Sequence, residues 1–443
     1  MRNLVIRHGR IIDPSTDRDE RADLFVVDGR VSDSAPGGSC EEIDAHGLIV
    51  APGLIDIHVH LREPGQIQKE TIESGTRAAA AGGFTSVVCM PNTDPPADNP
   101  STITLITDRI RDTALINVYP AGAITKGLMG EEMAPIGSMV QAGIVAITDD
   151  GHCVQNHELM RRAVEYAGMF DLAVFDHCQD YNMVGNGVMH EGYWSAILGL
   201  AGWPRTGEEI MVARNILLAD LCKTRIHCQH LSSEGSVRLL RDARARGVQI
   251  TGEICPHHIA LTDERVCSFD TNYKMNPPLR APEDVEALVE GVADGTITVL
   301  ASDHAPHAFF EKEVEFDVAP FGILGLETEF ALFCTILVHQ KKTIDLKRLI
   351  TLYTANPAAL LRLPKGTLKP GADADITLID PDLEWVFKKE TSFSRSRNTP
   401  FDGWKLKGRA VRTIVGGKTV WELPKNVFSA APRRAAVARS RDM

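Results

Sequence analysis

The stretch that decides the fold is Leu54-Ile55-Asp56-Ile57-His58-Val59-His60, an apolar run that ends in two histidines. Alternate side chains of a β-strand point to the same face, so His58 and His60 are predicted to project together from the end of one strand. Two imidazoles placed in this way can bind a divalent metal ion. The pair alone is weak, because one histidine could lie in the core and the other in solvent. It gains weight from three later apolar segments, which end close to His177, His230 and Asp303.

Apolar runs of strand length alternate with helical stretches through the middle of the chain. Continuous apolar strands separated by helices predict a parallel sheet that is covered on both faces. Eight such units closed on themselves form a (β/α)8 TIM-type barrel, which is the α/β fold that we expect. A doubly wound open sheet is the alternative. The eight predicted strands are residues 54–59, 85–90, 116–121, 144–147, 172–175, 225–228, 248–254 and 296–301.

The two ends of the chain differ from the middle, because both show short strands punctuated by turn residues. These strands are predicted at residues 3–7, 10–12, 23–27 and 47–50, and again at 374–379, 407–415 and 418–420. We therefore expect a small β-sandwich domain built from both termini. The predicted boundaries are 1–50 and 361–425 for its two parts, 51–360 for the barrel and 426–443 for a basic tail.

Composition excludes several classes of function. The 443-residue chain carries a formal charge of −12 and has a pI near 5.7, which argues against nucleic acid or an acidic membrane as partner. Nine cysteines include no Cys-x-x-Cys pair and mostly lie in apolar runs, which predicts reduced thiols in a cytoplasmic protein. Neither a signal peptide nor a membrane-spanning segment is indicated. The basic tail is expected to be a frayed terminus, with docking of a partner as the alternative.

Potential ligands follow the carboxyl ends of several predicted strands, which is where barrel enzymes carry their chemistry. Taken singly, each is better explained as an ordinary core or loop residue, but the whole set is hard to attribute to chance. Imidazole and carboxylate ligands without thiolate suit Zn²⁺, or Mn²⁺, Co²⁺ or Fe²⁺. Two such metals need a bridging anion and leave room for a bridging hydroxide, a strong nucleophile at neutral pH. The residues are His58, His60, Asn92, Asp149, Asp150, His177, His230, His257, His258 and Asp303.

At these residues the chain resembles the amidohydrolase superfamily and, more narrowly, the class I dihydroorotase family. Two motifs are shared by many amidohydrolases and indicate the fold: Ile49-Val50-Ala51-Pro52-Gly53-Leu54-Ile55-Asp56 and Gly371-Ala372-Asp373-Ala374-Asp375. Four others are similar to dihydroorotases in particular. They are His58-Val59-His60-Leu61-Arg62-Glu63-Pro64-Gly65, Met90-Pro91-Asn92-Thr93, Lys274-Met275-Asn276-Pro277-Pro278-Leu279-Arg280 and Asp303-His304-Ala305-Pro306-His307.

The resemblance implies a metal-ligand set. His58, His60 and Asp303 would hold one metal ion, His177 and His230 would hold the other, and Asp150 would bridge them. The expected cofactors are thus two divalent ions, with Zn²⁺ favoured. Many superfamily members bridge their metals with a carboxylated lysine, whereas this chain has aspartate at the end of the fourth strand. Spacing alone does not choose between Asp149 and Asp150; the family pattern favours Asp150.

The resemblance also implies substrate contacts. Arg62, Asn92 and His307 would grip a free carboxylate beside His60, and a guanidinium suits this task because it presents two parallel donors. Asn276 and the backbone of Phe321 and Gly322 would contact the amides of a pyrimidine ring, although Asn-Pro-Pro is also ordinary turn chemistry. Residues 308–320 are expected to form a loop beside the site and to act as a lid. His257 and His258 receive no ligand role.

The implied reaction is the reversible cyclisation of N-carbamoyl-L-aspartate to dihydroorotate in pyrimidine synthesis, through a metal-bridged hydroxide with Asp303 as general acid and base. The enzymatic rivals are allantoinase and dihydropyrimidinase or hydantoinase; these families carry the bridging lysine and lack the arginine clamp. A different rival is an inactive subunit that scaffolds an aspartate carbamoyltransferase, but no metal ligand is missing here. A homodimer and a carbamoyltransferase complex are the possible protein partners.

Overall fold

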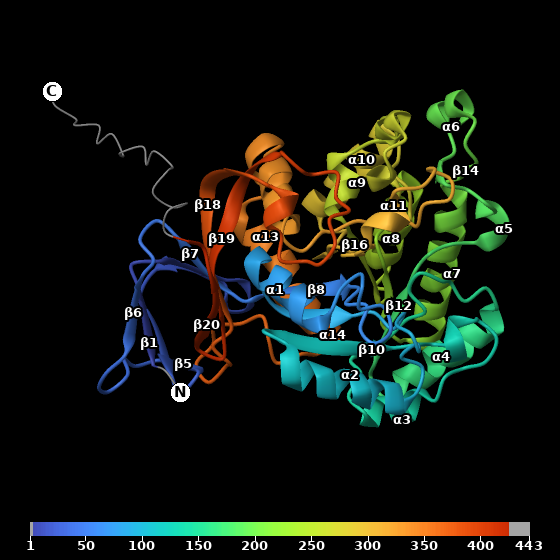
Figure 1. The fold of residues 1–443 in the computed structure, drawn as a ribbon. Coiled ribbons are helices and arrows are strands. Elements are labelled where there is room, and N and C mark those ends of the chain that lie inside the picture. The colour runs from blue at the N-terminus through green and yellow to red at the C-terminus, as the bar shows by residue number, and fades with distance from the viewer. Residues whose placement is uncertain (1–2, 425–443) are drawn as a thin grey trace.

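The computed structural model describes residues 3–424, and its centre is an eight-stranded parallel sheet (Figure 1). The strands follow one another around the sheet in sequence order, and two short strands, β13 (Met189–His190) and β14 (Gly202–Trp203), form a separate pair. A parallel bridge between Val59 and His304 joins the end of the first barrel strand to the chain beyond the last. This bridge closes the barrel and excludes the doubly wound alternative. The strands are β8 (Leu54–Val59), β9 (Phe84–Cys89), β10 (Asn117–Gly122), β11 (Ala146–Ile147), β12 (Ala173–Asp176), β15 (Ile226–Cys228), β16 (Ile250–Ile254) and β17 (Val299–Leu300).

All eight barrel strands were predicted from the sequence, although β11 and β17 are shorter than the apolar runs that contain them. Every residue of β8 and β9 is buried, as expected for strands covered on both faces. The principal helices are α1 (Ile72–Gly82), α2 (Pro100–Thr113), α3 (Ile136–Gln141), α4 (His157–Gly168), α7 (Thr206–Cys222), α8 (Glu234–Ala245), α10 (Pro282–Asp294), α13 (Leu346–Tyr353) and α14 (Ala355–Leu361).

Shorter elements decorate the barrel. Residues 309–312, inside the predicted loop 308–320, form the helical turn α11 (Phe309–Lys312), so part of this segment is helical. Between β12 and α7 lies an excursion that the sequence analysis did not predict, formed by α5 (Tyr181–Val184), β13 (Met189–His190), α6 (Tyr193–Leu198) and β14 (Gly202–Trp203). The remaining elements are α9 (Pro256–Ala260), α12 (Glu329–Phe333), a π-helix at Cys334–Gln340 and 3-10 turns at Pro14–Thr16, Lys126–Leu128, Asp263–Ser268, Thr271–Tyr273 and Lys389–Thr391.

Helix α1 shows how local sequence sets the start and end of an element. The Thr71 hydroxyl accepts from the Ser74 amide, and Ser74 reciprocates toward the Thr71 amide, which caps the helix. Gly83 ends the helix with φ of 95°, a left-handed conformation that suits glycine, and β9 begins at the next residue. The Thr413 hydroxyl donates to the Ala80 carbonyl, so the helix is also tied to the C-terminal part of the chain.

Both termini build the predicted β-sandwich, which lies on one side of the barrel (Figure 1). The N-terminal β7 pairs with the C-terminal β18 and with β2, so the two ends share one six-stranded sheet. Apolar residues from both ends, including Leu4 and Ile414, form one buried cluster. The strands are β1 (Leu4–Arg7), β2 (Arg10–Asp13), β3 (Arg18–Arg21), β4 (Leu24–Val27), β5 (Arg30–Ser32), β6 (Glu41–Asp44), β7 (Ile49–Pro52), β18 (Ile376–Val386), β19 (Lys405–Val415) and β20 (Lys418–Glu422).

The predicted domain boundaries stay predictions, and strand β7 (Ile49–Pro52) spans the first of them. The basic tail at 426–443 lies outside the described residues. Within residues 3–424, no helix combines the length and the apolar character that crossing a membrane requires.

Candidate metal centre and active site

His58 and His60 project from the end of β8 toward the same two carboxylates. The Nε2 atom of His58 lies 3.1 Å from Asp150 Oδ1, and that of His60 lies 3.3 Å from Asp150 Oδ2. Asp303, which follows β17, places its Oδ1 atom 3.0 Å from His60 Nε2 and 3.5 Å from His58 Nε2. All four side chains are buried. Four of the residues predicted from the strand ends therefore form one compact group in space.

Asp150 occupies the centre of the site, whereas its neighbour Asp149 does not. One Asp149 carboxylate oxygen accepts from the backbone amides of Ile124 (2.8 Å) and Thr125 (3.0 Å), and the other bonds the Thr125 hydroxyl. These bonds commit Asp149 to the loop after β10. Of the two aspartates between which spacing did not choose, it is Asp150 that faces the imidazoles.

The second pair of histidines approaches the same Asp150 oxygen as His58. His177 Nδ1 is 2.7 Å from His230 Nε2, and these atoms lie 3.9 Å and 3.8 Å from Asp150 Oδ1. His177 follows β12 and His230 follows β15, so adjacent barrel strands deliver them together. The Asp150 carboxylate therefore lies within 4 Å of all four imidazoles.

Hydrogen bonds at the far side of three rings favour tautomers whose inward nitrogens carry lone pairs when the rings are neutral. His58 Nδ1 donates to Glu253 Oε1 (2.6 Å), because a carboxylate can only accept. His60 Nδ1 lies 2.9 Å from the side-chain oxygen of Asn92, and His177 Nε2 lies 2.9 Å from that of Gln179. Each of these imidazoles consequently presents a bare nitrogen to the centre when it is neutral.

Lone pairs that face one another need a cation between them. Asp150 Oδ1 is buried and accepts no hydrogen bond from residues 3–424. Two groups of residues each bring their potential ligand atoms within 4.8 Å of one another. One is His58, His60 and Asp303, and the other is His58, Asp150 and His230. Nitrogen and carboxylate donors of this kind fit a divalent metal. The site is thus a divalent-metal centre by its donor set and its orphaned carboxylate oxygen.

The charges in this centre depend on one another. Burial opposes ionisation of Asp150, but His58, His60 and His177 outweigh it and hold the pKa of its carboxyl well below the usual value. Burial likewise disfavours the charged form of His58, but the carboxylates of Asp150, Glu253 and Asp303 raise its pKa well above normal. His230 has a lowered pKa, because burial and the neighbouring imidazoles of His177 and His58 act together. Positive charge is therefore favoured where the carboxylates converge.

Three residues of the predicted site have left-handed backbone conformations. The φ angles are 61° at Arg62, 30° at His230 and 46° at Asp303. Side chains with a Cβ disfavour this region by roughly 1–2 kcal/mol per residue. Such strain persists where the surrounding structure enforces it, and it is concentrated at functional sites.

Arg62 and His307 lie buried at the edge of the centre. The Nε of Arg62 donates to the Pro306 carbonyl at 3.3 Å. Burial lowers the pKa of Arg62 to about 10, and the charges of Asp303 and Asp150 oppose this shift. His307 Nε2 donates to the Phe321 carbonyl at 2.7 Å, whereas its buried Nδ1 has no hydrogen-bond partner in residues 3–424.

Asn276 and the Phe321-Gly322 backbone border the same region. Asn276 Nδ2 donates to the side-chain oxygen of Gln179 (2.9 Å), and its own oxygen is buried without a partner among the described residues. The Gly322 amide donates to the Lys274 carbonyl (3.0 Å). Gln179 therefore touches both a predicted metal ligand and a predicted substrate contact.

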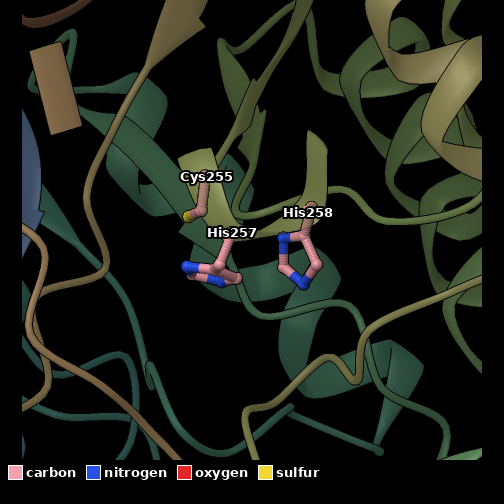
Figure 2. A group of neighbouring side chains, drawn as sticks. All are labelled: Cys255, His257 and His258. Atoms are coloured by element: carbon pink, nitrogen blue, oxygen red, sulfur yellow. The ribbon is translucent and has the colours of Figure 1, made fainter. Parts of the chain in front are cut away.

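His257 and His258 gather with Cys255 in a third group of potential ligands. Figure 2 shows the Cys255 sulfur on the same side as the His257 ring nitrogens, with the His258 ring on the other side. His258 Nε2 donates to the Pro277 carbonyl (3.0 Å), and neither nitrogen of His257 has a partner in residues 3–424. Neither histidine was predicted to be a metal ligand, and the proposed function does not involve this group.

Sequence reasoning missed the residues that hold the ligands in place. Glu253 lies inside the apolar run of β16, and Gln179 follows His177 by two residues. A charged residue within a strand buried on both faces was a usable signal for Glu253, since such a charge needs a partner. No comparable signal marked Gln179.

Comparison with known proteins places the chain in a family. A model described as "Dihydro-orotase-like" matches residues 47–236, and one described as "Amidohydrolase family" matches residues 224–421. The protein named Dihydroorotase from Pelotomaculum thermopropionicum is 53% identical, over 95% of this chain and 98% of the relative. That from Syntrophotalea carbinolica is 50% identical, over 95% and 99%.

Solved structures share the architecture. L-hydantoinase (dihydropyrimidinase) from Arthrobacter aurescens has a TM-score of 0.85 at 25% identity and covers 95% of this chain and 96% of that one. Dihydropyrimidinase from Brevibacillus agri, at 24% identity and a TM-score of 0.83 over 95% of each chain, shows the fold alone. Because relatives half identical in sequence span nearly the whole chain, this protein belongs to the dihydroorotase family of the amidohydrolases.

Proposed function

We propose that this protein is a dihydroorotase, which interconverts N-carbamoyl-L-aspartate and dihydroorotate. The observation that carries the proposal is the buried Arg62, which lies two residues beyond His60 and interacts with the charges of Asp303 and Asp150. A buried guanidinium beside a hydrolytic centre suits a substrate with a free carboxylate, because the fork of donors matches the two oxygens. The names of the relatives support the same assignment.

We propose Zn²⁺ as the native metal, with His58, His60 and Asp303 at one position, His177 and His230 at the other, and Asp150 between them. Divalent ions held there would supply Lewis-acid chemistry, which activates water and polarises a carbonyl group at neutral pH. The chain supplies no thiolate to either position, and imidazole and carboxylate donors suit Zn²⁺.

Asp303 is proposed as the proton carrier. In ring opening, water adds to the ring amide carbon, the carbon–nitrogen bond breaks, and Asp303 takes a proton from the water and delivers it to the leaving nitrogen. Ring closure reverses these transfers. Arg62, Asn92 and His307 orient the substrate carboxylate, while Asn276 and the Phe321-Gly322 backbone orient the ring. The Asp303 carboxylate lies within 3.5 Å of the His58 and His60 imidazoles, which places it to carry this proton.

Turnover measurements on three substrates test the proposal. Dihydroorotate should be hydrolysed far faster than allantoin or a hydantoin that lacks a carboxylate, and prolonged chelation should abolish the reaction until Zn²⁺ or Mn²⁺ is restored. Metal analysis of the same preparation should give two ions per chain. Preferred turnover of allantoin or hydantoin would replace this function by that rival, and a stable protein that binds metal without turning over any of them would favour the scaffold role.

A cytoplasmic location is proposed on the nine cysteines, which are all free thiols. Association with a second copy or with an aspartate carbamoyltransferase remains a prediction, which sedimentation of the purified protein alone and with that enzyme would test.

A further inference from the structure

Lys312 is buried at the end of α11, which is unusual for a lysine. Its ammonium nitrogen lies 2.7 Å from the Pro320 carbonyl oxygen, 3.1 Å from that of Thr271 and 3.5 Å from that of Lys274. An ammonium group has three donors and no acceptor. Three backbone carbonyls thus match the donors of this side chain without any carboxylate.

Burial and hydrogen bonding act on this ammonium in opposite directions. Burial, with the nearby charge of Lys274, lowers the pKa of Lys312 to about 7. The carbonyl oxygens favour the charged form, because they accept from all three of its protons. A buried cation is costly unless it is hydrogen-bonded, so its position requires that these three carbonyls stay together.

The three carbonyls belong to two separate segments that border the proposed substrate site. Thr271 and Lys274 precede Asn276, while Pro320 immediately precedes Phe321, whose carbonyl accepts from His307 Nε2. The backbone of Lys312 adds a further tie, since its carbonyl accepts from the Thr271 hydroxyl at 2.6 Å. One side chain therefore joins the segments that carry the ring contacts.

Lys274 also joins the two segments, because it lies in residues 271–276 and its side chain contacts residues 313–322. Its side chain is buried, its ammonium donates to the Asp317 carbonyl at 2.9 Å, and it lies 4.7 Å from the centre of the Phe321 ring. A cation over an aromatic face is attractive. The segment after α11 is thus held by two lysines, and only Lys312 contacts both segments through its ammonium group.

We propose that Lys312 is a positioning residue for substrate binding: its ammonium group fastens residues 313–322 to residues 271–276 and thereby holds Asn276, Phe321 and His307 in their places. The inference rests on the proposed function for its kinetic consequence, but its structural consequence is independent of it. The ammonium group of Lys312 bonds three backbone carbonyls, none of which belongs to a proposed metal ligand. Its loss should therefore affect the binding of substrate and leave the metals in place.

The first test compares Lys312→Met with the wild type. Methionine keeps the length of the stem and removes the donors. The KM for dihydroorotate should rise about tenfold or more, the loss typical of hydrogen bonds to a charged group, while kcat changes less and metal content stays the same. Lys341→Met, which removes an outlying lysine paired with Glu286, is the matched control and should leave both constants unchanged.

Hydrogen exchange separates this inference from the proposed function. Amides of residues 313–322 and 271–276 should exchange faster in Lys312→Met than in the wild type, whatever substrate the protein turns over. Unchanged exchange in both segments would overturn the inference even if the enzyme is a dihydroorotase. Faster exchange in Lys312→Met, together with a wild type that does not turn over dihydroorotate, would support the role of Lys312 in holding the two segments and would contradict the proposed function.

A rescue experiment distinguishes positioning by the ammonium from simple loss of packing. Lys312 lines a cavity of about 420 Å³, together with His307 and Asn398, so a small cation has room to enter beside it. Methylammonium should restore a substantial part of the lost kcat/KM in Lys312→Ala, whereas ethanol, which is of similar size and uncharged, should not. Failure of both Lys312→Arg and added methylammonium to recover activity in a folded, metal-loaded protein would contradict the proposal.

Discussion

Glu253 Oε1 lies 2.6 Å from His58 Nδ1, and the other oxygen of the same carboxylate lies 3.0 Å from His227 Nε2. All three side chains are buried, and 195 residues separate Glu253 from His58. The contact fixes the ring of His58 with its Nε2 toward Asp150. A carboxylate in this position also makes the imidazole a stronger ligand, because it stabilises positive charge on the ring.

Glu253→Gln should weaken metal binding without removing a ligand. The expected loss of affinity is about 10- to 100-fold, the usual effect of changing a residue that orients a metal-bound histidine. Competition with a chelator, followed by metal analysis, measures it. Glu329→Gln is the control, because Glu329 is also fully buried and burial raises its pKa well above normal. Equal metal retention in Glu253→Gln and Glu329→Gln would contradict the role of Glu253.

Reconstitution with metal should not need bicarbonate. A carboxylated lysine forms from carbon dioxide, and no lysine lies between Ile144 and Gly151, where Asp150 occupies the central position. The measurement is recovery of activity in degassed buffer with and without added bicarbonate. Lys126 would be the first lysine to examine if bicarbonate proved necessary, although its ammonium pairs with Glu132 at the surface.

Arg62→Lys should be severely impaired even though it keeps the positive charge. A lysine cannot present two parallel donors, and the loss of a charge-assisted contact typically costs about 1.5–3 kcal/mol, or roughly ten- to hundredfold in kcat/KM. The comparison that isolates the carboxylate uses dihydroorotate and a hydantoin without a carboxylate, since only the first should lose rate. Wild-type turnover of dihydroorotate by Arg62→Ala would remove the main support for the substrate.

Asp303→Asn should lose several orders of magnitude in kcat in both directions. Loss of a general base costs typically about 10²–10⁴-fold, and the amide is also a poorer metal ligand. Because the two causes act together, metal content must be measured in the same sample. A variant with full metal and near-normal rates would show that another group carries the proton, and His304 or His307 would be examined next.

Stability should fall in acid partly because of His190. Burial and the neighbouring Arg280, whose guanidinium donates to His190 Nδ1 at 3.1 Å, lower the pKa of this histidine to about 3. The folded protein thus binds fewer protons here than the unfolded chain between pH 6.5 and 3, and stability declines as pH falls through that window. Between pH 6.5 and 4, the free energy of unfolding of His190→Asn should fall by roughly 2–3 kcal/mol less than that of the wild type. Denaturant unfolding of both proteins at several pH values measures the difference; parallel curves would contradict it.

Local pattern carried the prediction of the fold. Each barrel strand was visible as an apolar run because strands covered on both faces bury every side chain, and β8 and β9 do so. Strand β3, with the charged sequence Arg-Asp-Glu-Arg, was not predicted. It lies at the edge of its sheet and buries almost nothing, so it needs no apolar residues.

The sequence by itself determined the barrel, the sandwich from two ends and the kinds of ligand that end the strands, because these follow from periodicity over a few residues. Only the tertiary structure decided which atoms face the centre. Asp149 and Asp150 are neighbours on the chain, and it is the amides of Ile124 and Thr125 that hold one and leave the other to the imidazoles. The ring of His58 is likewise oriented by Glu253, 195 residues away along the chain. Hydrogen bonds of this kind act through space between distant segments, so they come into existence only when the barrel has closed.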